Sequence, residues 1–152
     1  MMNIKEILPD KSITLSIESR FENVSLVGIT VKAICDFIFI NKNEPYNMEL
    51  SVTEAVTNAI KHAYNSEQGQ NVEINVSVYS DKMVFKISDI GKGMNPTQCN
   101  SNNVCLDFEP DKIETLPVGG MGLHIINSLM DEVLYETIEG KNTITLVKFI
   151  KK

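Results

Sequence analysis

Hydrophobic residues along this chain recur with two periods, and the changes between the periods outline the expected elements. Apolar residues alternate with polar ones in five runs, as in strands with one buried face: 12–18, 72–78, 83–87, 133–138 and 143–150. They recur at three- and four-residue steps, as in amphipathic helices, over 23–38, over 49–64 and in the segment after Leu123. This order of elements predicts an α+β fold with a mixed, largely antiparallel sheet and helices on one face.

The helix predicted over Glu49–Tyr64 carries three polar residues at four-residue spacing, Glu54, Asn58 and His62. This spacing stacks the three side chains on one side of the helix. A carboxylate can take a proton from a nucleophile, and an amide oxygen one turn later can be a hard ligand for Mg²⁺. A solvated helix face would show the same pattern, so the helix alone leaves both interpretations open.

The strand that begins at Met83 ends in an unusual residue. Asp89 continues its inward-facing row, which directs a carboxylate toward the core, where an unpaired charge is costly and requires a hydrogen-bond donor. Gly91 and Gly93 follow at once and would allow a tight turn and the close approach of a ligand. A strand that ends in a glycine turn is common, so this motif by itself is compatible with a purely structural role.

A long irregular segment, about 94–118, precedes a second glycine-rich stretch. It contains three prolines and no sustained periodicity, which is typical of a functional lid or of a mobile loop. The stretch Gly119–Leu123 then opens directly into the last predicted helix. Free backbone N–H groups at such a helix start favour phosphate binding, although a plain glycine cap has the same sequence.

Composition narrows the functional classes. The net charge of −6 argues against a nucleic-acid surface, which needs clustered Lys and Arg. No run of the sequence is long enough for a membrane span, and the amino terminus lacks the apolar core of a signal peptide. Three cysteines without a CxxC pair (Cys35, Cys99 and Cys105) fit free thiols in a reducing compartment, so we expect a cytoplasmic protein.

Taken in order, three motifs resemble the signature of the GHKL ATPases: E-x-x-x-N-A on a helix, D-x-G-x-G after a strand, and G-x-G-L at a helix start. The phrases TEAVTNAIKHAY and GGMGLHIINSLMDEV are most similar to the bacterial anti-sigma factor serine/threonine kinases. The resemblance implies the Bergerat ATP-binding fold, a two-layer α/β sandwich, as a single domain over 1–152 with its lid at about 94–118. It also implies ATP and Mg²⁺ as cofactors.

The resemblance also implies roles for individual residues. Glu54 would be the general base, Asn58 the Mg²⁺ ligand, and Asp89 the acceptor for the adenine amino group. The remaining expected nucleotide-binding residues line the pocket wall, the phosphate side or the adenine side: Lys61, Gly91, Gly93, Gly119, Gly120, Gly122, Leu123 and Thr143. A solvated helix-face lysine is an equally good interpretation of Lys61.

The function implied is phosphorylation of a STAS-type anti-anti-sigma protein, with a sigma factor held inactive in the alternative nucleotide state. Two alternatives stay open: a nucleotide-dependent partner-binding switch without kinase activity, and a histidine-kinase catalytic domain acting in trans. The resemblance further implies a homodimer formed through the first strand and helix.

Two positions differ from the family pattern or have no assigned role. Gly28 stands where close relatives carry a partner-binding arginine, and His62 is expected to be a packed or capping histidine.

Overall fold

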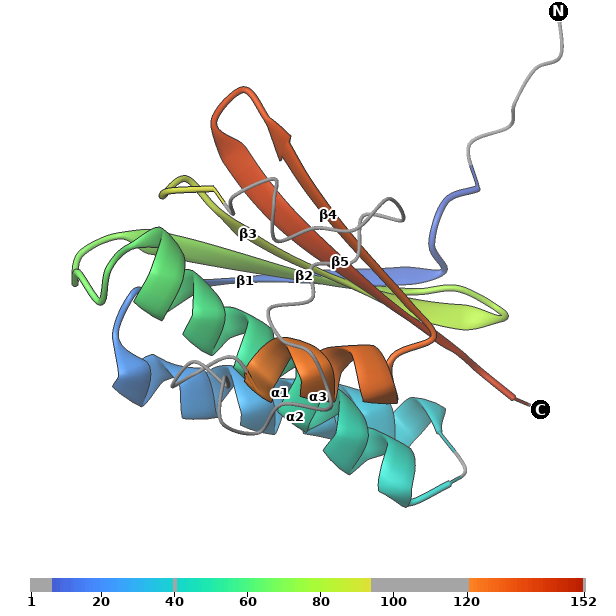
Figure 1. Ribbon diagram of the computed structural model, residues 1–152. Coiled ribbons are helices and arrows are strands. Elements are labelled where there is room, and N and C mark those ends of the chain that lie inside the picture. The colour runs from blue at the N-terminus through green and yellow to red at the C-terminus, as the bar shows by residue number, and fades with distance from the viewer. Residues whose placement is uncertain (1–6, 40, 94–120, 152) are drawn as a thin grey trace, which may run out of the picture.

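The computed structural model describes residues 7–39, 41–93 and 121–151, which form one sheet and one layer of helices (Figure 1). The expected segment of 94–118, together with Gly119 and Gly120, therefore lies outside the described residues. The elements in chain order are β1 (Lys11–Glu18), a 3₁₀ turn (Phe21–Asn23), α1 (Val24–Ile38), α2 (Asn43–Asn58), a π-helical turn η2 (Ala59–Ala63), β2 (Asn71–Val78), β3 (Lys82–Asp89), α3 (Met121–Leu129), β4 (Glu132–Ile138) and β5 (Lys141–Phe149).

The five strands of the described chain lie in the order β1-β2-β3-β5-β4, and every neighbouring pair is antiparallel. The expectation of an α+β fold with helices on one face is confirmed, whereas the mixed sheet is not, because no parallel pair occurs among these strands. The register of β3 against β5 sets Asp89 opposite Asn142 and Ser88 opposite Thr143. Successive residues of a strand point to opposite faces, so these two pairs face opposite sides of the sheet.

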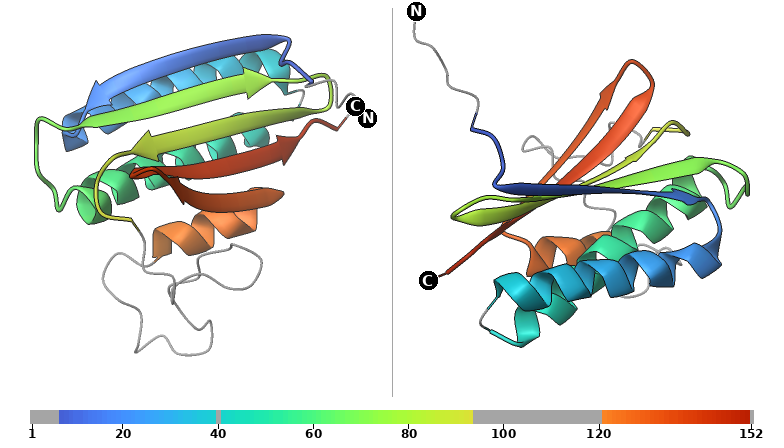
Figure 2. Two further views of the ribbon diagram at one scale, coloured as in Figure 1. Left: turned by 90° about the horizontal axis from the view of Figure 1, so that it is seen from above. Right: turned by 180° about the vertical axis from the view of Figure 1, so that it is seen from behind.

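The helices cover one face of the sheet, as the two further views show (Figure 2). α1 and α2 pack side by side, and α3 packs against α2. The core between helices and sheet is built from the apolar rows of the sequence, and its largest fully buried side chains are Phe85, Met48, Ile60, Ile74, Met83, Ile126 and Leu146. The periodicity of the sequence predicted these rows because the side of each element that faces this core is apolar.

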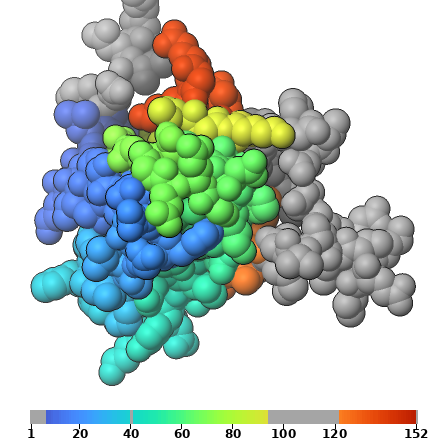
Figure 3. Space-filling view, turned by 90° about the vertical axis from the view of Figure 1, so that its left-hand side faces the viewer, coloured from blue at the N-terminus to red at the C-terminus, as the bar shows by residue number. Residues whose placement is uncertain are grey.

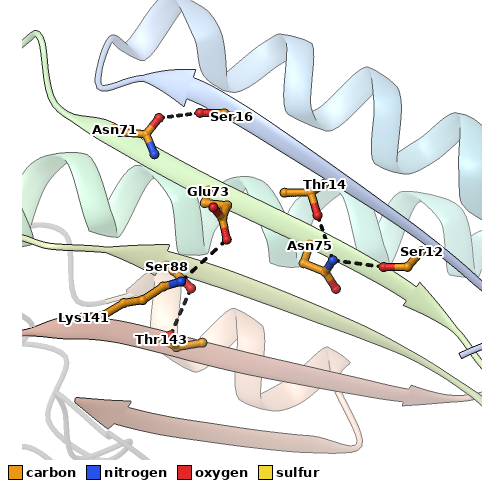
Figure 4. A network of polar contacts seen from close by, with 9 residues as sticks. All are labelled: Ser12, Thr14, Ser16, Asn71, Glu73, Asn75, Ser88, Lys141 and Thr143. Atoms are coloured by element: carbon orange, nitrogen blue, oxygen red, sulfur yellow. Dashed lines mark hydrogen bonds and ion pairs between the residues drawn. The ribbon is translucent and has the colours of Figure 1, made fainter. Parts of the chain in front are cut away.

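The face of the sheet opposite the helices carries short polar side chains that hydrogen-bond to one another (Figure 4). Asn75 Nδ2 donates to the hydroxyls of Ser12 and Thr14 at 3.1 and 3.0 Å, and the Ser88 and Thr143 hydroxyls lie 3.0 Å apart. These groups satisfy one another across the strands, so this face needs no helix layer over it.

The helix predicted over Glu49–Tyr64 begins earlier than its periodicity indicates and ends in a different conformation. α2 begins at Asn43, and Pro45 sits in its first turn, where a missing backbone N–H costs nothing. After Asn58 the backbone widens into η2, in which Tyr64 N donates to Ala59 O. The α-helical spacing that places Glu54 and Asn58 one turn apart therefore ends at Asn58, and His62 lies in the π turn.

Candidate functional site

The polar stripe of α2 meets the start of α3 at Gly122. A methyl group built on Gly122 would lie 2.7 Å from Glu54 Oε2 and 3.4 Å from Asn58 Nδ2. The absence of a side chain at Gly122 is therefore what lets the two helices approach here. The structure thus brings together one residue of the expected glycine stretch with the expected base and metal ligand.

This meeting point has the chemistry of a phosphate and cation site. The first turn of α3 has backbone N–H groups without helical partners and carries the positive end of the helix dipole. Glu54 and Asn58, both half-buried, place a carboxylate and an amide oxygen beside that turn. A carboxylate, an amide and a helix start can together hold a hydrated divalent cation and an anionic group.

Asp89 forms a second polar centre at the end of β3. Its Oδ1 accepts hydrogen bonds from Gly91 N at 3.0 Å and from Asn142 Nδ2 at 2.8 Å. Among the described residues no hydrogen-bond donor contacts Oδ2. Burial raises the pKa of the Asp89 carboxyl above its usual value, and the hydrogen bonds from Asn142 and Gly91 oppose this rise.

Asn142 is a residue of this centre that we did not single out in the sequence. It is 2% exposed, donates also to Gly91 O at 2.9 Å, and accepts from the Thr137 hydroxyl at 2.7 Å. A signal was present in the pattern, because Asn142 heads the inward row that continues with Ile144 and Leu146. This is the same signal that Asp89 gives at the end of the inward row of β3.

The turn after β3 links the two centres through Gly91. A methyl group on Gly91 would lie 2.3 Å from Ala63 O, the last carbonyl of η2, and Lys92 N donates to that oxygen at 2.8 Å. Tyr64 supports the same contact, since its hydroxyl accepts from Ile90 N at 2.9 Å. The end of β3 (yellow) therefore lies directly against the end of the α2–η2 segment (green), as the space-filling view shows (Figure 3).

Other expected site residues are placed differently. Thr143 was expected on the adenine side, but the alternation of β5 places its hydroxyl 3.0 Å from that of Ser88 on the open sheet face, away from Asp89. Leu123 belongs to the hydrophobic core, so its side chain anchors α3. Lys61 and His62 are both exposed on η2, so of the two roles expected for His62, packed or capping, the packed one is excluded.

Gly93 and Gly28 are explained by close approach. A methyl group on Gly93 would lie 3.0 Å from Asn142 Oδ1, so this glycine does border the Asp89 centre. Gly28 is buried where α1 crosses α2, and a methyl group there would lie 2.9 Å from Thr53 Cγ2. A larger residue at this position would have to displace the side chains of Thr53 or Glu49, so in this chain the position is a packing site.

The described residues contain no group of three or more His, Cys, Asp or Glu that could hold a metal ion. A cation that keeps several waters and binds phosphate oxygens needs only one or two protein ligands, so Asn58 is compatible with Mg²⁺. Cys35 is a buried free thiol whose pKa burial raises to about 12, which makes it unreactive. None of the helices in the described part of the chain has the length and hydropathy needed to cross a bilayer.

Comparison with known proteins agrees with this geometry. Residues 17–148 match the family described as the histidine kinase-like ATPase domain. The chain belongs to this family. A curated relative, serine-protein kinase RsbW of Staphylococcus epidermidis, is 32% identical over 142 residues, which cover 92% of this chain and 87% of that protein. The predicted class, an ATP-dependent protein serine/threonine kinase of the GHKL type, is therefore confirmed at the level of the family.

Solved structures of this histidine kinase-like ATPase fold agree in architecture. The RsbU and RsbW domains of Rv1364c from Mycobacterium tuberculosis match with a TM-score of 0.62 at 13% identity. The match covers 93% of this chain and 32% of that one, so this chain spans about a third of its length. A chain of the SiaB–SiaC complex from Pseudomonas aeruginosa matches with a TM-score of 0.55 at 13% identity, covering 90% of this chain and 89% of that one.

Proposed function

We propose that this chain binds Mg-ATP and phosphorylates a serine or threonine of a STAS-type anti-anti-sigma protein, and that it sequesters a sigma factor in its other nucleotide state. The observation that carries the proposal is the close approach of Glu54 and Asn58 to Gly122 at the start of α3. Asp89 lies near the other end of the same α2–η2 segment, because the turn that follows it packs against Ala63. The relatives named serine-protein kinases support the substrate class, and the SiaB–SiaC structure supports a protein partner for the fold.

Each polar centre has a task in this proposal. Asp89 Oδ2 accepts a hydrogen bond from the adenine amino group and so orients the base. The N–H groups at the start of α3 and the oxygen of Asn58 hold the phosphate end, where Mg²⁺ supplies neutralisation of the phosphate charge. Glu54 takes the proton of the acceptor hydroxyl as the phosphoryl group leaves the nucleotide. We propose that the protein acts in the cytoplasm as a single domain.

A phosphorylation assay tests this proposal. The purified chain is incubated with ATP labelled in the γ-phosphate and with each STAS-domain protein of the source genome. We expect one of them to acquire label that is stable in acid, as phosphoserine and phosphothreonine are, at a residue located by mass spectrometry. Acid-labile label on histidine would instead favour a histidine kinase acting in trans. ATP binding without transfer to any STAS protein would favour the nucleotide-dependent switch.

We also propose a homodimer formed through β1 and α1. β1 is an edge strand, and an apolar groove separates it from α1, lined by Ile13, Ile34, Phe37, Ile38, Val76 and Val78. Phe37 is 93% exposed and Ile13 47% exposed, which is unusual for large apolar residues that have no partner. Pairing of two such edges around a twofold axis would cover both the groove and the strand edge.

Phe37→Asp is expected to weaken this dimer at least about tenfold, because it places a charge in a desolvated apolar contact. Analytical ultracentrifugation over a concentration series measures the change in the dimer dissociation constant. Leu134→Asp is the matched control, since Leu134 is 45% exposed on β4, the opposite edge strand. A dimer that is sensitive to Leu134→Asp and insensitive to Phe37→Asp would place the interface on the wrong edge.

A further inference from the structure

Asn142 is the most highly connected buried polar side chain near Asp89. It joins three segments of the chain: the end of β3 through Asp89, the following turn through Gly91 O, and β4 through Thr137. It is 2% exposed, so a ligand at Asp89 would not reach it directly. Any effect of Asn142 on a ligand must pass through the groups that it holds.

The partners of Asn142 determine which way its amide points. Asp89 Oδ1 and Gly91 O have no hydrogen to give, so the amino end of the amide must face them, at 2.8 and 2.9 Å. The oxygen end is then left for Thr137, whose hydroxyl donates to it at 2.7 Å. The amide cannot turn over without losing its hydrogen bonds to Asp89 and Gly91, because the turned oxygen would face two acceptors.

This arrangement determines the orientation of the Asp89 carboxylate. The amino group of Asn142 and the N–H of Gly91 both point at Oδ1, which fixes the plane of the carboxylate. Oδ2 is then presented as an acceptor in one direction. An acceptor in one place can distinguish a purine that carries a 6-amino group from one that carries a 6-oxo group, because only the amino group can donate to it.

We propose that Asn142 is a positioning residue that sets the base selectivity of the nucleotide site by holding the Asp89 carboxylate with Oδ2 toward the base. The inference rests on the proposed function, which places the adenine amino group at Asp89. The competing explanation is that Asn142 only braces the β4–β5 hairpin against the Gly91 turn. Loss of a brace would weaken the binding of every nucleotide, whereas loss of a positioning residue would weaken mainly the binding of those with a 6-amino group.

The test measures the affinities for Mg-ATP and Mg-ITP by titration calorimetry in the wild-type chain and in Asn142→Ala. ITP carries a 6-oxo group and the same triphosphate. We expect Asn142→Ala to lower ATP affinity about five- to tenfold and to change ITP affinity less than about twofold, because a charge-assisted hydrogen bond becomes poorly aligned. Thr145→Val is the matched control on the open face of β5, and it should leave both affinities unchanged.

A second variant keeps the test decisive if Asn142→Ala does not fold, as circular dichroism would reveal. Thr137→Val removes only the donor that locks the amide oxygen, so it should lower the ATP-to-ITP preference in the same direction by a smaller factor. An equal loss for both nucleotides, or an unchanged ratio in a folded variant, would overturn the role of Asn142 and leave the proposed function intact. A wild-type chain that binds neither nucleotide would overturn the proposed function itself.

Discussion

Replacing Glu54 with glutamine is expected to lower phosphoryl transfer to the STAS partner at least about a hundredfold while nucleotide affinity changes little. The carboxamide keeps the shape of the side chain beside Gly122 but cannot take up the proton of the acceptor hydroxyl. Removal of one negative charge from the phosphate neighbourhood should, if anything, tighten Mg-ATP binding slightly. Single-turnover transfer from labelled ATP measures the rate, and calorimetry measures the affinity.

Two variants on the same helix show whether the effect is specific to Glu54. Glu49→Gln changes the same residue type on the side of α2 that faces Gly28 of α1, and it should transfer phosphate at the wild-type rate. Asn58→Ala should weaken Mg-ATP binding itself, because it removes the protein ligand of the cation. Transfer by Glu54→Gln at the wild-type rate would remove Glu54 as the general base, and the partner-binding switch would then become the better account of the site.

Replacing Asp89 with asparagine is expected to lower ATP affinity about 10- to 150-fold, which corresponds to about 1.5–3 kcal/mol. The structure gives this substitution a definite orientation. The donors on Asn142 and Gly91 would hold the oxygen of the new amide, so its amino group would replace Oδ2. A donor would then face the adenine amino group, which is also a donor. The same change should improve binding of ITP relative to ATP, which calorimetry with the two nucleotides would measure.

The Asp89→Asn variant is expected to stay folded. Because burial raises the pKa of Asp89, its ionised form is disfavoured in the folded chain relative to the unfolded one. The carboxyl group therefore stabilises the fold best below its unfolded pKa, and this contribution is lost as pH rises through the folded pKa. The amide removes this cost at neutral pH, so the melting temperature should not fall.

Asp81→Asn, in the exposed turn before β3, is the control at the other end of the strand. It should leave the affinities for ATP and ITP and the melting temperature unchanged. Unchanged ATP affinity in a folded Asp89→Asn protein would show that the base does not bind at this carboxylate.

The sequence by itself determined the α+β class, the helices on one face and most element boundaries. It could do so because the face that each element turns to the core is apolar, and the order of apolar residues along the chain shows the period of that face. It also singled out Glu54, Asn58 and Asp89. Glu54 and Asn58 are polar residues one helical turn apart, and Asp89 is a polar residue in an otherwise apolar row. Packing alone requires neither pattern. These features depend on neighbours within one helix or strand, and local order in the chain is sufficient to predict them.

Only the tertiary structure decided which segments meet and which face of the sheet each polar residue joins. The sequence carries no register between β3 and β5, so it could not show that Asn142 lies opposite Asp89 or that Thr143 points away from it. Nor could it show that Gly28 is at a helix crossing and Gly91 against a carbonyl of η2. Contacts between distant segments depend on strand register, helix packing and the π turn after Asn58, and a shift of one residue in a strand reverses the face of every side chain.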